Sequence, residues 1–174
     1  IILRYNKTIL EILWRNRYER SSFYLYSKSH STIQTRATPR SFNNRFPHLA
    51  QYHMKLAQIL YKHNQLQCCI ILCDWALTSM LKALYMKETN SIFPPKLLSM
   101  ADLLHLLHTE TNPGLDVVVF IGTTQFLSSQ LETPLLQKMK QKDVSRLLRR
   151  TDDILCQLSS RVITDPSETY QSIF

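Results

Sequence analysis

The sequence predicts an all-α protein, an up-and-down bundle of four to five helices preceded by a loosely ordered basic N-terminal extension. Two observations favour this class. Apolar residues recur at steps of three and four throughout residues 66–88 and spread onto a second face, as in a central helix. The 174 residues include only two glycines, too few for the many tight turns of a sandwich or barrel. A helix that is apolar on several faces needs neighbours on several sides, so the remaining helices should surround it.

The charge distribution separates an N-terminal extension, residues 1–46, from the bundle. Residues 1–50 hold nine Lys or Arg against two Glu, whereas residues 51–174 hold twelve against eleven acidic residues. Residues 1–18 have the pattern of an amphipathic helix, and residues 19–46 are rich in Ser, Thr, Asn and Arg without periodicity, as in a linker. We therefore expect a bundle domain at 47–163 and a frayed C-terminal tail at 164–174.

Each bundle helix has its own signal. A stripe of apolar residues predicts a first helix from Pro47 to about Asn64, and the prolines at 94 and 95 end the central helix. Ser99 followed by Asp102 has the spacing of a capping box and predicts a short third helix.

The last two helices depend on weaker signals. Residues 115–127 are rich in β-branched residues that favour a strand, but no partner strand is apparent, so a helix is expected. Thr133 and Pro134 resemble a helix start, and a long helix is expected over 135–162, with Arg149 and Asp153 forming a surface ion pair.

The cysteines and the hydropathy pattern indicate a cytoplasmic protein with no membrane segment. The four cysteines, Cys68, Cys69, Cys73 and Cys156, lie within helical patterns and resemble small core residues rather than a disulfide framework. No stretch resembles a signal peptide, and the longest uncharged run, 117–130, is too short and polar to span a bilayer.

Three features together resemble the HEPN family of small helical-bundle domains. In the central stretch DWALTSMLKALYMKE, Asp74, Ala76, Lys82 and Ala83 occupy places like those of the family's A-x-E-x-x-x-K-A-like pattern. The second feature is the loop with two prolines followed by ADLLHLL, and the third is the closing stretch KDVSRLLRRTDDILCQLSSRV. The resemblance covers about residues 48–163.

The resemblance implies a bundle that pairs as a homodimer, often beside a nucleotidyltransferase partner in a toxin–antitoxin type pair, with a groove that binds nucleotide or cuts RNA. The family's ribonucleases carry Arg and His separated by four to six residues, and this chain has no such pair. Ala101 also stands where many relatives have His before Asp-Leu in the third helix. No catalytic residue is therefore predicted, and the protein is expected to lack the family's ribonuclease motif.

A nucleotide- or RNA-binding groove, if present, is predicted to use Trp75, Lys82, Arg146 and Arg150. The aromatic ring would stack on a base, and the cations would contact phosphates. The structural alternative is that Trp75 fills the core and the arginines solvate a helix face. No glycine-rich phosphate loop or nucleophile elbow is visible, and no cofactor is predicted.

Two residue groups have spacings that a metal or thiolate site can use. Asp102, His105 and His108 lie three apart on one predicted helix face, but no fourth ligand can be named. Cys69 and Cys73 share a face of the most apolar helix, where core packing competes with any site. No metal site is predicted from either group.

The sequence leaves three functional hypotheses. The first is a HEPN-like, nucleotide- or RNA-associated bundle, and the second is a non-catalytic bundle that presents an apolar face to a protein partner and binds no nucleotide. In the third, the basic extension binds nucleic acid.

Overall fold

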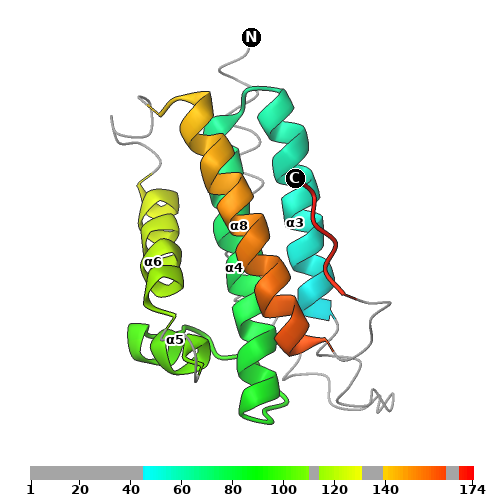
Figure 1. Ribbon diagram of the computed structural model, residues 1–174, viewed down its shortest axis with the longest axis vertical. Helices are drawn as coiled ribbons and strands as arrows, with labels where there is room; N and C mark the ends of the chain where they lie inside the picture. The colour runs from blue at the N-terminus through cyan, green and yellow to red at the C-terminus, as the bar shows by residue number, and fades with distance from the viewer. Residues whose placement is uncertain (1–44, 110–113, 131–138, 164–168) are drawn as a thin grey trace, which may run out of the picture. The chain divides into compact units, whose positions relative to one another are not determined.

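The computed structural model describes residues 45–109, 114–130, 139–163 and 169–174. In this part of the chain the fold is all-helical with no strand, which confirms the predicted class (Figure 1). The chain divides into two units, Ile1–Ala37 and Thr38–Phe174, and the described residues belong to the second. The predictions for residues 1–44 therefore lie outside the described residues. The described helices are α3 (Arg45–Lys62), α4 (Leu66–Glu88), α5 (Met100–Leu107), α6 (Leu115–Ser129) and α8 (Gln141–Val162).

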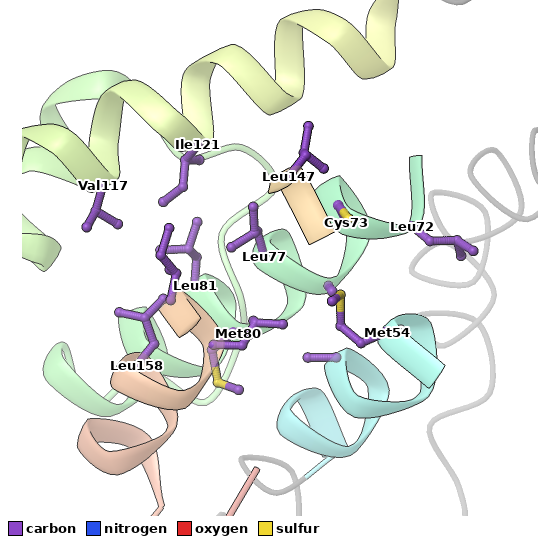
Figure 2. Close-up of a cluster of buried hydrophobic side chains, with 14 of the residues drawn as sticks. Met54, Leu72, Cys73, Leu77, Met80, Leu81, Val117, Ile121, Leu147 and Leu158 are labelled. Atoms are coloured by element: carbon purple, nitrogen blue, oxygen red, sulfur yellow. The ribbon is translucent and has the colours of Figure 1, made fainter. Parts of the chain in front are cut away.

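Helix α4 is the central helix that the sequence predicts. It packs against α3, α5, α6 and α8, and side chains around most of its circumference are buried. Figure 2 shows side chains of α3, α4, α6 and α8, among them Met54, Leu77, Ile121 and Leu158, in one buried cluster. The apolar pattern of residues 66–88 therefore reflects burial against several neighbouring helices, as expected for a helix that is apolar on nearly all of its faces.

Helix α4 is also long and apolar enough to cross a membrane by length and composition. However, 78% of its most apolar window is buried inside the protein. The core helix of a soluble protein passes the same test, so this property alone does not indicate a membrane span.

Helices α5 and α6 pack against each other, and Gly114 lies at the start of α6, close to the end of α5. The Ser99 hydroxyl accepts a hydrogen bond from the Asp102 amide at 3.1 Å, and the Asp102 carboxylate accepts one from the Ser99 amide at 2.8 Å, which confirms the predicted capping box. Gly114 has φ +69°, and a Cβ on it would lie 2.5 Å from the carbonyl oxygen of Leu107. Only glycine therefore permits this turn and this close approach.

The helical prediction for residues 115–127 is confirmed, because α6 covers Leu115–Ser129. The Thr123 and Thr124 hydroxyls donate hydrogen bonds to the carbonyls four residues earlier, at 2.8 and 2.9 Å. Both hydroxyls are therefore satisfied within the helix itself. Val117, Val118 and Ile121 are buried in the core without a sheet, on a helix that packs against α4 and α5. Tertiary packing thus outweighs their strand propensity.

Helix α8 begins later than predicted. Residues 139 and 140 are not helical, so the expected continuous helix over 135–162 is wrong, and Thr133 and Pro134 lie outside the described residues. The Asp143 carboxylate accepts a hydrogen bond from the Lys140 amide at 3.3 Å and satisfies a donor at the helix start. The sequence analysis missed this acidic first-turn residue.

The prediction of a frayed tail is wrong for residues 170–174, which we call the C-terminal strap. These residues follow an extended path beside α3 (Figure 1, red) and make specific hydrogen bonds to α3 and α8. Tyr170 is only 6% exposed and belongs to the core cluster, and Ile173 packs against that cluster. The strap is therefore part of the folded domain.

Candidate functional site

Trp75 is half-buried in the contact between α4 and α3. Its ring meets the imidazole of His53 edge to face, with centroids 5.6 Å apart and planes at 61°. Trp75 also packs against the buried core cluster. This environment agrees with the structural alternative in which Trp75 fills the core, and it leaves only part of the ring to stack on a base.

Lys82 lies seven residues after Trp75 on α4, so helical geometry puts the two on nearly the same face. Lys82 is half-buried. A binding role for these two residues stays a prediction.

Arg150 forms an ion pair with Asp116 of α6, with 2.6 Å between Nη2 and Oδ2. This pair replaces the expected Arg149–Asp153 pair, which is absent from the ion pairs of the described residues. Because the Arg150 and Asp116 side chains are 40% and 60% exposed, the pair contributes at most about 1 kcal/mol to stability. Asp116 nevertheless partly neutralises the charge of Arg150, which was expected to contact phosphate.

Arg146 and Arg149 are exposed on α8, whereas Arg150 is half-buried. Trp75 contacts His53 of α3, whereas Arg150 contacts Asp116 of α6. These two predicted site residues therefore interact with different helices. Arg146 and Arg149 thus share one exposed face of α8.

The Asp102, His105 and His108 group does not assemble into a metal site among the described residues. Within this part of the chain, no group of three or more His, Cys, Asp or Glu side chains is placed to hold a metal ion. The Asp102 carboxylate is instead engaged by Ser99, whose hydrogen bonds hold the pKa of that carboxyl below its usual value. His108 caps the other end of α5 and is exposed.

The cysteines of α4 are buried free thiols. Burial raises the pKa of Cys69 to about 12 and raises the pKa of Cys73 as well. The Cys69 thiol donates to the carbonyls of Gln65 and Ala57 at 3.2 and 3.4 Å. Thiols in this state are neutral at physiological pH, which agrees with the predicted role as small core residues rather than nucleophiles or thiolate ligands.

The sequence analysis missed an apolar surface on the outer face of α6. Leu115, Val119 and Phe126 are 57%, 58% and 57% exposed, and their spacing of four and then seven residues puts them in one line along the helix. Met100 of α5, 53% exposed, lies over Gly122 in the same line, because a Cβ on Gly122 would lie 3.4 Å from its Cε. We call this line of residues, Met100, Leu115, Val119 and Phe126, the α6 stripe. Its signal in the sequence is a helix that is apolar on two opposite faces.

The sequence analysis also missed a buried carboxylate on α8. Asp152 is 2% exposed and accepts hydrogen bonds from the Tyr170 hydroxyl at 2.7 Å and the Ser172 hydroxyl at 2.6 Å. Burial, together with the hydrogen bond to Asp152, raises the pKa of the Tyr170 phenol, which therefore stays protonated and donates. The signal was available, because Asp152 lies four residues after Leu148 and three before Leu155 on the inward face.

Comparison with protein-family models, with curated proteins and with solved structures finds no match to this chain. The HEPN resemblance consequently stays an expectation from the sequence, and function has to be argued from the surfaces described above.

Proposed function

We propose that this protein is a non-catalytic helical-bundle interaction module that pairs with a second copy through the α6 stripe. The observation that carries the proposal is the row of large apolar side chains on the outer face of α6, each more than half exposed. Contiguous exposed apolar surface on a folded domain marks interaction sites, since leaving it in water forgoes the free energy of burial. The buried face of α6 is already occupied by core contacts, and α4 and α5 are the helices that it packs against.

A second copy suits this surface for reasons of symmetry and charge. When two copies of α6 run antiparallel about a two-fold axis, Leu115 of one copy lies near Phe126 of the other, and Val119 lies near the axis. Asp116 is the one charged residue of α6, and Arg150 pairs with it. Self-association of this helix therefore brings no uncompensated like charges together.

Replacing Val119 with aspartate tests this proposal. We expect the wild-type chain to sediment as a dimer and Val119→Asp to raise the dimer dissociation constant by about 100-fold or more, because the change places two desolvated carboxylates at the interface. Sedimentation equilibrium measures both constants. Gln157→Asp, an equally acidic change on the exposed face of α8, is the matched control and should leave the constant unchanged. A monomeric wild-type chain, or equal effects of the two variants, would contradict the proposal.

A second candidate function is HEPN-like association with a nucleotide or RNA, beside a nucleotidyltransferase in a toxin–antitoxin type pair. The observation that favours it is the adjacent exposed arginines Arg146 and Arg149 on α8, with Lys142 one turn earlier. Exposed guanidinium groups in a row along a helix can contact successive phosphates. Trp75 contributes little to this candidate, since its ring packs toward His53.

Replacing Arg146 with alanine tests the second candidate by fluorescence anisotropy with a labelled single-stranded RNA. We expect weaker binding and a salt dependence whose slope falls by about one when the phosphate contact is lost. Lys55→Ala, which removes an exposed cation from α3, is the control for overall charge. Equal losses in the two variants would mean that RNA association does not use the α8 surface, and absence of binding by the wild type would exclude the candidate.

A further inference from the structure

The C-terminal strap is held mainly by side chains that recognise main-chain groups. The Gln51 amide of α3 donates to the carbonyl of Gln171 at 2.9 Å and accepts from its amide at 2.8 Å. Gln58, two turns along α3, donates to the carbonyl of Ile173 at 3.0 Å. Main-chain groups are paired here much as an adjacent β-strand would pair them, which is how many proteins bind extended peptides.

Asp152 adds selectivity for particular side chains. Its carboxylate accepts from the hydroxyls of Tyr170 and Ser172 and from the amide of Ile173, at 3.2 and 3.1 Å to its two oxygens. The amide of Phe174 completes the set at 3.4 Å. A buried carboxylate is costly unless it is fully hydrogen-bonded. Within the part of the chain that the structure describes, the hydrogen bonds to the Asp152 carboxylate come from the strap.

Gln51, Gln58 and Asp152 together, which we call the strap site, thus have the properties of a peptide-binding site. Tyr170 supplies the buried aromatic anchor, as in the hot spots of protein interfaces. The hydroxyls at the first and third strap positions define a pattern, Tyr-x-Ser followed by two apolar residues. The strap residues thus supply both the hydroxyl donors and the buried aromatic ring that the strap site binds.

We propose that the strap is a detachable peptide ligand and that the strap site of one copy can bind the strap of a second copy. The strap has no helical residues, and α8 ends at Val162, only eight residues before Tyr170, the first residue of the strap, in the sequence. Every bond that the strap makes can therefore be made equally by the same segment of another chain, which is the basis of domain swapping. This inference concerns a different surface from the α6 stripe and does not depend on the proposed function.

The covalent link between the strap and its own chain determines when binding of a second copy's strap becomes measurable. A short tether gives the chain's own strap an effective concentration in the millimolar range, so the internal strap outcompetes an external one. Weakening the internal strap removes this competition, and the apparent affinity for an external strap should then rise in proportion to the fraction of open sites.

A complementation experiment tests the exchange with two folded full-length variants. Ser172→Asp places a carboxylate against Asp152 and disables the strap, whereas Asp152→Asn disables the site. A mixture of the two contains one intact strap and one intact site on different chains. With Val119→Asp added to both chains to suppress pairing through α6, we expect heterodimers in native mass spectrometry with a dissociation constant at least about 10-fold below that of either variant alone.

Matched controls use neighbouring positions of the same chemistry. Asp153→Asn and Ser160→Asp change exposed residues of α8 and leave strap and site intact, so their mixture should show no gain in heterodimer. Circular dichroism verifies folding of each variant, and Gln51→Ala replaces Asp152→Asn if the latter is unfolded. An equal heterodimer fraction in the test and control mixtures would overturn the proposal.

Direct peptide binding gives an independent readout. A fluorescent synthetic peptide with the sequence of residues 169–174 should bind the Ser172→Asp chain at least about 10-fold more tightly than the wild-type chain, whose site is occupied. Adding Gln51→Ala to the Ser172→Asp chain should abolish that gain. Equal, weak binding to all three chains would also overturn the proposal.

Discussion

Replacing Asp152 with asparagine should lower the free energy of unfolding by about 3 kcal/mol. Hydrogen bonds to a charged group contribute about 1.5–3 kcal/mol each, but these bonds are not additive because the strap can detach and let water reach the site. Asparagine keeps one acceptor oxygen and turns an amide group with two donors toward the hydroxyl and amide donors of the strap. Urea denaturation followed by circular dichroism measures the loss.

Asp153→Asn is the matched control for this prediction, because Asp153 is the next residue on α8 but is exposed. A surface change of this kind should alter the free energy of unfolding by less than about 0.5 kcal/mol. Similar values for the two variants would mean that the bonds from Tyr170 and Ser172 do not stabilise the native state. Faster amide exchange at Ile173 in Asp152→Asn alone would locate the loss at the strap.

Replacing Leu81 with alanine should lower the free energy of unfolding by about 3–4 kcal/mol. Leu81 is 1% exposed on α4 and belongs to the buried cluster that also contains Ile121 of α6 and Leu158 of α8 (Figure 2). Truncation removes three carbons from water-free surroundings and leaves a cavity between helices that cannot fully collapse, for which losses of about 2–5 kcal/mol are typical. Thermal and urea unfolding both report the change.

Leu97→Ala provides the control, since Leu97 lies in the segment before α5 and is 88% exposed. The same chemical change there should cost less than about 0.5 kcal/mol. A loss at Leu81 below about 1 kcal/mol would contradict the central position of α4, and with it the enclosure of that helix by its neighbours.

The most reliable predictions from the sequence were those that depend on local spacing. Helix α4 has the bounds that its apolar pattern predicts, and Ser99 caps α5 as its distance from Asp102 predicts. Both signals act over one helical turn, so neighbouring residues suffice to specify them. The start of α8 was placed too early, because the prediction relied on a proline-based start signal and missed the acidic first-turn residue Asp143.

The candidate sites were harder to predict because they depend on which helices meet. Arg150 was expected to contact a ligand, and its actual partner, Asp116, lies 34 residues away in the sequence. Trp75 was assigned either to a groove or to the core, and only the position of His53 on α3 shows its packing. Whether either residue binds a nucleotide stays a prediction.

Local sequence patterns alone predicted the helical class, the central position of residues 66–88 and the core-like character of the α4 cysteines. These properties follow from the periodicity and composition of a single segment, which can be determined without knowing which other segments pack against it. The apolar face that α6 leaves in water and the binding of Tyr170 to Asp152 became visible from the packing of the helices. Gln51 and Gln171 are 120 residues apart, and such pairings depend on the packing of whole helices rather than on any local pattern.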